Sequence, residues 1–208
     1  MKLNKLIQVS VSLFMLIGFI CGCASVGKQF TYNGSSSLQL GKTSLADCEK
    51  IYGKPNAEQT IDNADGKFDI VRYLYAHANL SSAQSRVLIL EFRDGVLNSY
   101  DYLSSFDEDR TVVNTDQQNQ IKSGTSTKSD VVRIMGQPHG MAQCPSQNAD
   151  FKDKCAKGTQ VWVWNGMNKL STLGHTFSGD QIEMQSIFVV FNKDGIVTDV
   201  EVSQTKNR

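Results

Sequence analysis

Two stretches of the chain repeat the same order of polar and apolar positions. The first runs from Gly41 to Pro55 and the second from Gly124 to Pro138. In both, a hydroxyl residue is followed three positions later by aspartate, then by two apolar residues spaced i, i+4, and then by Gly-x-Pro. The i, i+4 spacing places the apolar pair on one face of a helix. The pattern therefore predicts a short amphipathic helix in each half of the chain.

Capping residues specify both ends of these predicted helices. Each helix begins at a hydroxyl residue, and the aspartate three positions later approximates a capping box. Each ends at a glycine suited to a left-handed C-cap, and a proline two positions later prevents continuation. The residues in these roles are Ser44, Asp47, Gly53 and Pro55 in the first copy and Thr127, Asp130, Gly136 and Pro138 in the second.

Apolar and alternating segments after each helix predict three antiparallel strands per copy. These segments are Tyr73–Tyr75, Val87–Phe92 and Val96–Tyr102, then Trp162–Trp164, Ser186–Phe191 and Ile196–Val202. Asp94-Gly95 and Asp194-Gly195 mark hairpin turns. A second short helix is expected before each capped helix, around Ser35–Leu40 and Asp116–Ile121. The expected fold class is α+β: two tandem helix-helix-β-β-β units, with antiparallel sheets and helices packed on one face.

The domain boundaries follow from these patterns and from composition. We expect residues 39–103 to form the first unit and residues 119–203 the second, joined by a polar linker over residues 104–118. Residues 23–38 are expected to be a flexible tether and residues 204–208 a tail, while residues 1–22 are a leader.

The leader is typical of a bacterial lipoprotein. Lys2 and Lys5 precede an uncharged, mostly apolar run from Leu6 to Ile20, shorter than the roughly 20 residues that a membrane span takes. Ile20-Cys21-Gly22-Cys23 then resembles a lipobox. The resemblance implies cleavage before Cys23 and acylation of that cysteine; an ordinary secretory cleavage near Ala24 is the alternative. Because Ala24 follows the cysteine, and not aspartate, the resemblance implies the outer membrane, facing the periplasm.

The remaining cysteines fit an oxidising compartment. Cys144 and Cys155 flank a short polar loop and are predicted to form a disulfide, which contributes about 3 kcal/mol or less. A zinc site is the weaker interpretation, because no CxxC spacing is present. Cys48, on the apolar face of the first helix, is predicted to be a buried free thiol.

Composition and charge exclude several classes of function. The chain has 208 residues, with 21 basic and 21 acidic side chains and a formal net charge of zero, which argues against a general nucleic-acid binder. His77, His139 and His175 lie in no metal-ligand spacing, so no metal, cofactor or small-molecule substrate is expected. Ser178, His175 and Asp180 offer a hydrolase hypothesis, but catalytic triads usually assemble from distant segments, and an enzyme is not expected.

Pairs of aromatic residues two positions apart occur in three predicted strands. Each pair shares one face of its sheet, because side chains alternate along a strand. If these faces lie opposite the helices, they form an exposed surface suited to binding a protein; otherwise they form the core. We predict partner binding by these six residues, and expect the last to be the more exposed tryptophan: Tyr73, Tyr75, Tyr100, Tyr102, Trp162 and Trp164.

Taken together, the repeated helix motif, the aromatic-x-aromatic strand and the hairpin after Phe92 or Phe191 resemble the SmpA/OmlA (BamE-like) lipoprotein family over most of residues 39–203. The tandem arrangement resembles that of β-lactamase inhibitory proteins. The resemblance implies a non-enzymatic outer-membrane lipoprotein that binds an envelope protein in outer-membrane assembly or maintenance. The alternative that it implies is a protein inhibitor of a periplasmic or secreted enzyme.

Overall fold

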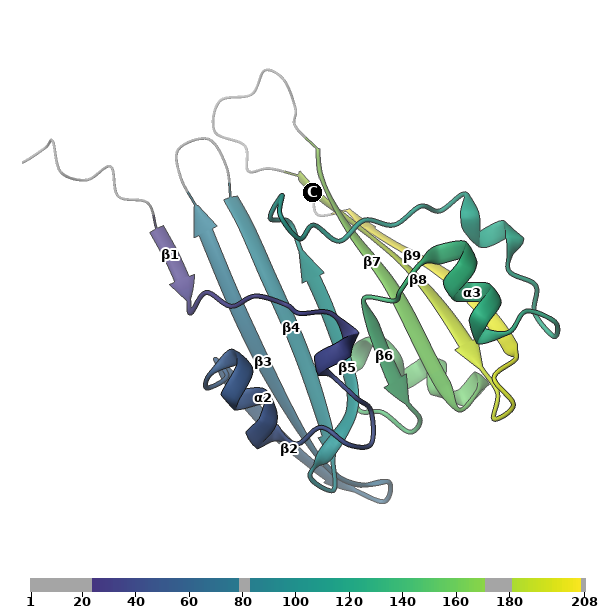
Figure 1. Cartoon of the computed structure of the whole chain (residues 1–208), viewed down its shortest axis with the longest axis horizontal. Coiled ribbons are helices and arrows are strands. Elements are labelled where there is room, and N and C mark those ends of the chain that lie inside the picture. The colour runs from purple at the N-terminus through teal and green to yellow at the C-terminus, as the bar shows by residue number, and fades with distance from the viewer. Residues whose placement is uncertain (1–23, 79–82, 171–180, 207–208) are drawn as a thin grey trace, which may run out of the picture.

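The two halves of the chain share one antiparallel β-sheet (Figure 1). The computed structural model describes residues 24–78, 83–170 and 181–206, and these contain nine strands. Their order across the sheet is β1-β3-β4-β5-β6-β7-β8-β9, with β2 also paired to β3. The halves join where β5 pairs with β6, through Ser99, Tyr100 and Asp101 opposite Ala142, Met141 and Gly140.

The first half contains β1 (Ala24–Gly27), a 3-10 turn η1 (Ser35–Ser37), helix α2 (Leu45–Tyr52), β2 (Ala57–Asn63), β3 (Gly66–Ala78), β4 (Ala83–Arg93) and β5 (Val96–Ser104). The second half contains η2 (Gln117–Gln120), α3 (Lys128–Met135), β6 (Gly140–Gln143), α4 (Ala149–Lys152), η3 (Asp153–Lys157), β7 (Gln160–Leu170), β8 (Gln181–Phe191) and β9 (Val197–Lys206). Among the described residues, no helix is long and apolar enough to cross a bilayer.

The expected α+β fold of two helix-helix-β-β-β units is wrong. Within the described ranges, three short α-helices accompany nine strands. The helices expected before α2 and α3 are single 3-10 turns, η1 and η2. At η1, Ser36 and Ser37 donate their hydroxyls to the carbonyls of Asn33 and Gly34, which competes with helix formation. The short strands β1, β2 and β6 lacked a clear alternating pattern and were not predicted.

The two capped helices are confirmed. Both capping boxes are complete, with the Asp47 and Asp130 carboxylates accepting hydrogen bonds from the N-cap backbone N–H groups. Hydrogen bonds, chiefly from the Ser44 side chain, lower the pKa of Asp47 to about 2. Gly53 ends α2 at φ +80°, which favours glycine, although its ψ of −163° is extended and not that of a left-handed helix.

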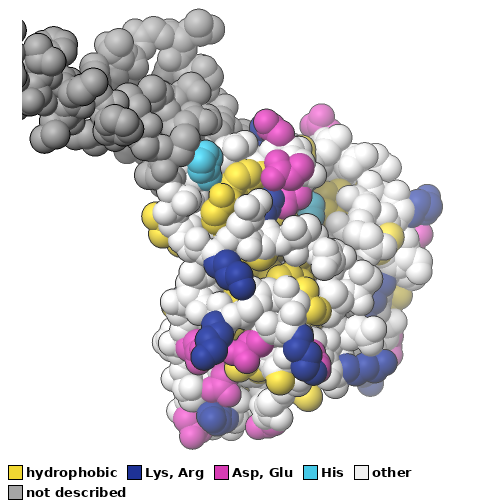
Figure 2. All heavy atoms as spheres, turned by 60° about the vertical axis from the view of Figure 1, so that its left-hand side comes forward, with side chains coloured by type: hydrophobic (Ala, Val, Ile, Leu, Met, Phe, Trp, Pro, Cys, Tyr) yellow, Lys and Arg dark blue, Asp and Glu magenta, His cyan; other side chains and the backbone are white. Residues whose placement is uncertain are grey.

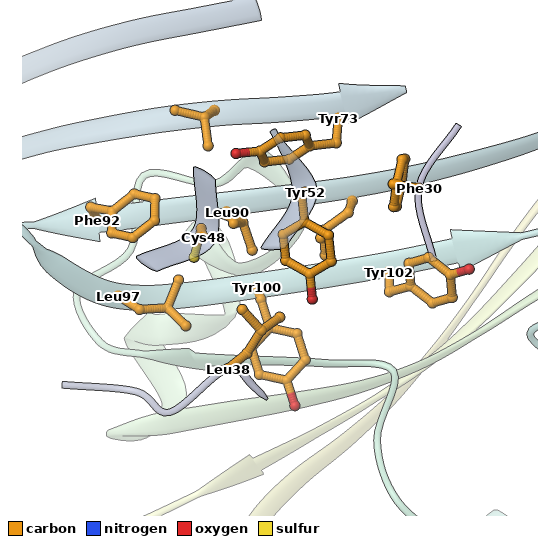
Figure 3. Packing of buried hydrophobic residues seen from close by; sticks show 12 residues of the cluster. Phe30, Leu38, Cys48, Tyr52, Tyr73, Leu90, Phe92, Leu97, Tyr100 and Tyr102 are labelled. Atoms are coloured by element: carbon orange, nitrogen blue, oxygen red, sulfur yellow. The ribbon is translucent and has the colours of Figure 1, made fainter. Parts of the chain in front are cut away.

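Helices α2 and α3 cover the same face of the sheet, each over its own cluster of buried side chains (Figure 1). Under α2, Cys48 and Tyr52 pack with residues of β3, β4 and β5, and Figure 3 shows this packing from close by. Under α3, Val131 packs with residues of β7, β8 and β9. Met141 contacts both clusters, so the core continues across the junction.

The opposite face is covered in the second half by the segment between β6 and β7. Phe151 of α4 packs there with Val163 and Phe188 in a third cluster. A disulfide joins Cys144 to Cys155, as the sequence predicts, and Cys48 is a buried free thiol. We refer to residues 144–158 as the disulfide loop.

Candidate partner-binding surface

The predicted aromatic binding face is not exposed. Exposed fractions are 8% for Trp162 and 2% for Trp164, and Tyr73, Tyr100 and Tyr102 are also buried. The core alternative therefore holds for these five, because α2 and α3 pack over that face of the sheet. Trp164, expected to be the more exposed tryptophan, is the less exposed one; its indole N–H donates to the Gly136 carbonyl at the end of α3 over 3.3 Å. Tyr75 is half-buried and stacks on Phe106.

A buried arginine on this helix-covered face ties two connecting segments to the sheet. Arg86 of β4 is 2% exposed and donates to the Phe30 carbonyl. Its guanidinium also pairs with Asp109 at 2.7 Å and lies over the Phe106 ring at 4.6 Å. Phe30 belongs to the segment expected to be a tether, and Asp109 to the expected linker. Both segments thus pack on the first half, and Leu38 is buried as well.

The other face of strands β3, β4 and β5 carries a row of apolar side chains. Leu74 pairs with Val87 and Val87 with Leu103, so the three lie side by side across the sheet. Ile89 lies in the next row, between Arg72 and Asp101. All four apolar side chains are half-buried, and none belongs to the three core clusters or packs against them. We call Leu74, Val87, Ile89 and Leu103 the open face.

The disulfide loop bounds the open face at one end, because a buried carboxylate holds the loop there. Glu91 follows Ile89 on this face of β4 and is fully buried. One carboxylate oxygen accepts the Asn98 amide at 2.7 Å. The other accepts the backbone N–H groups of Gln147 and Asn148, each at 2.7 Å, and the Ser146 hydroxyl at 3.2 Å. Glu91 therefore links the first half of the chain to the loop of the second.

A polar chain crosses the junction of the halves beside the open face. The Asn165 amide donates to Asp101 over 2.5 Å, and Ser186 donates its hydroxyl to Asn165 over 2.8 Å. Burial, and then the neighbouring Asp150 carboxylate, raises the pKa of Asp101 to about 8. The shift favours the neutral form of Asp101 and so weakens the negative charge beside the open face. Gly140 makes this fit possible, since a Cβ there would lie 2.7 Å from the Tyr100 carbonyl and 2.9 Å from the Asp101 carboxylate.

The two described histidines, His77 and His139, belong to no metal-binding group among the residues that the structure describes. His139 accepts the Asn165 backbone N–H at Nδ1, and burial lowers its pKa. His77 lies near the end of β3. No group of three or more potential ligands among the described residues could hold a metal ion. His175, Ser178 and Asp180 lie outside the described residues, as does Cys23.

Two acidic residues that shape this surface, Glu91 and Asp101, were not predicted from the sequence. Glu91 interrupts the apolar run Val87–Phe92, and Asp101 lies between two tyrosines. A charged residue within an apolar strand is rarely buried without a partner, so each position was a detectable signal. Charge elsewhere is mixed: Figure 2 shows acidic and basic side chains interspersed on the face that it presents, with hydrophobic side chains between them.

Comparison with models of known protein families found no match, and no curated protein matches the chain. The resemblance to the SmpA/OmlA family therefore gains no support from these comparisons. Among solved structures, a Streptococcus mutans protein described as a candidate β-lactamase inhibitor matches with a TM-score of 0.41 and 13% identity. The match covers 85% of this chain and 90% of that one.

Proposed function

We propose that this protein is a lipid-anchored, non-enzymatic module of the outer membrane that binds an envelope protein through the open face. The observation that supports this proposal is the half-buried row of Leu74, Val87 and Leu103, which lies outside the three core clusters. A contiguous row of partly exposed apolar side chains outside the core is typical of an interaction site.

The surroundings of the open face suit a protein partner. Arg72 is exposed beside Ile89, and arginine is enriched in protein interfaces. On its other side Ile89 pairs with Asp101, whose pKa is raised by burial, which favours its neutral form. An apolar centre with polar and charged neighbours is the usual composition of such an interface.

The lipid anchor in this proposal rests on the lipobox resemblance at Cys23. Metabolic labelling with a fatty-acid probe tests it. We expect the wild type to be labelled and Cys23→Ser to be unlabelled. Continued labelling of Cys23→Ser would move the anchor to Cys21 or remove the lipoprotein interpretation.

The binding role is tested by crosslinking in intact envelopes, followed by mass spectrometry of the crosslinked peptides. Val87→Lys places a charge at the centre of the open face, while the long side chain can reach solvent. Val202→Lys is the matched control, because Val202 is a β-strand valine on the opposite edge of the sheet and 43% exposed.

We expect Val87→Lys to lose crosslinks to the wild-type partner and Val202→Lys to keep them, with equal thermal stability for both. Equal crosslinking by the two variants would remove the open face as the binding surface. A partner that proves to be one soluble enzyme, whose activity falls on binding, would favour the inhibitor alternative over a role in outer-membrane assembly.

A further inference from the structure

One corner of the sheet, next to the start of the described chain, has no charged residue in its strand ends; the nearest charged groups, Arg86 with Glu108 and Asp109, pair with each other beside it. It consists of β1 together with the ends of β3 and β4 that pair beside it, namely Ala24–Gly27, Tyr75–Ala78 and Ala83–Ser85. We call these residues the N-terminal corner. The sequence contains no Lys, Arg, Asp or Glu between Tyr73 and Ser85. In a chain that is 20% charged, these strand ends can therefore lose contact with water without the cost of desolvating a charge of their own.

Strand β1 holds the start of the described chain in a fixed position on this corner. Its four residues pair in register with β3, from Ala24 opposite Ala78 to Gly27 opposite Tyr75. Gly27 has φ +80°, and a Cβ there would lie 1.9 Å from the Leu74 carbonyl oxygen, so only glycine lets the strand lie this close. Just beyond β1, Phe30 is buried and bound by Arg86.

The position of β1 removes any spacer between a lipid anchor and the folded sheet. Cys23 is bonded directly to Ala24, the first residue of β1, and consecutive Cα atoms are about 3.8 Å apart. Acyl chains attached to Cys23 would thus enter the bilayer one residue from the corner. Such tethering gives the corner a high effective concentration at the lipid surface, so that even a weak contact is populated.

We infer that the N-terminal corner lies against the lipid headgroup region, with Val26 in contact with lipid; this inference rests on the proposed acylation of Cys23. Val26 is apolar and 62% exposed, and it pairs with Ala76, so it lies on the same sheet face as Leu74. The open face begins in the next row of that face. The partner that it binds is then a protein located at the membrane surface.

The test places a tryptophan at this corner and at a matched distant position. Val26→Trp reports on the corner. Val96→Trp is the control: Val96 is 39% exposed and pairs with Arg93 at the other end of β4. Ser85 of β4 lies in the same row as Val26. From Ser85 to Arg93, strand β4 spans about 27 Å at about 3.4 Å per residue. The native Trp162 and Trp164 are buried, and their emission is subtracted with the wild type.

Each acylated full-length mature variant is reconstituted into vesicles of phosphatidylethanolamine and phosphatidylglycerol, with or without doxyl-labelled lipid. We expect the added Val26→Trp emission to be mostly lost with doxyl lipid and shielded from acrylamide. The Val96→Trp emission should be unaffected by doxyl lipid and open to acrylamide. Equal quenching of the two variants would overturn the inference while leaving the anchor intact. Failure of the wild type to float with the vesicles would instead remove the anchor, and the inference with it.

Discussion

Glu91 offers the sharpest test of how the two halves are held together. Its carboxylate accepts four hydrogen bonds, and three of them come from Ser146, Gln147 and Asn148 of the disulfide loop. Glu91→Gln keeps the shape of the side chain but replaces one acceptor oxygen with an NH2 group. Either orientation of the new amide then opposes a donor: the backbone N–H groups of the loop on one side, or the amide of Asn98 on the other.

The expected loss of stability follows from this geometry. An opposed and unsatisfied buried donor costs about 1–3 kcal/mol, and hydrogen bonds to a charged acceptor are stronger than those to a neutral one. We therefore expect Glu91→Gln to reduce the free energy of unfolding by about 2–4 kcal/mol. Glu58→Gln is the control, because Glu58 is exposed on β2 and its change should stay within about 0.5 kcal/mol.

Urea unfolding followed by tryptophan fluorescence measures both variants, with the disulfide intact. The slope of unfolding free energy against urea should not change, since the same surface is exposed on unfolding. Hydrogen exchange should also increase at the amides of Gln147 and Asn148 before the rest of the sheet. If Glu91→Gln lowers the free energy of unfolding no more than Glu58→Gln does, then the carboxylate does not hold the loop and the reasoning is wrong.

Three further outcomes are expected. Trp164→Ala should lose about 3–5 kcal/mol of stability in a thermal melt, because the side chain is 2% exposed; an unchanged melt with lost partner binding would restore its role as an interface residue. Burial raises the pKa of Asp101 to about 8 in the folded protein, whereas in the unfolded chain it is about 4. The contribution of Asp101 to the free energy of unfolding is therefore fully present below about pH 4 and is lost as the pH rises to about 8. In Asp101→Asn the urea midpoint of unfolding should depend less on pH between about pH 4 and 8. A pH dependence equal to that of the wild type would contradict this assignment. Thiol counting on the denatured, unreduced mature protein should find Cys48 alone, whereas three free thiols would disprove the disulfide.

Local signals in the sequence were sufficient for helices α2 and α3 and for several strands. Ser44 with Asp47, and Thr127 with Asp130, define where α2 and α3 begin, because a capping box is completed within four residues. The hairpin turns at Asp94-Gly95 and Asp194-Gly195 likewise depend only on neighbouring residues. The disulfide was predictable from a short loop and an inferred oxidising compartment.

Which face of the sheet is buried was decided only by tertiary structure. In β4, Leu88 and Leu90 point to one face and Val87 and Ile89 to the other, so alternation does not distinguish core from surface. The choice follows from where α2, α3 and the disulfide loop pack, and these contacts join residues far apart in the chain. The joining of both halves into one sheet also depends on residues far apart in the chain. Strand β6 can pair with β5 only because Gly140, opposite Asp101, has no side chain.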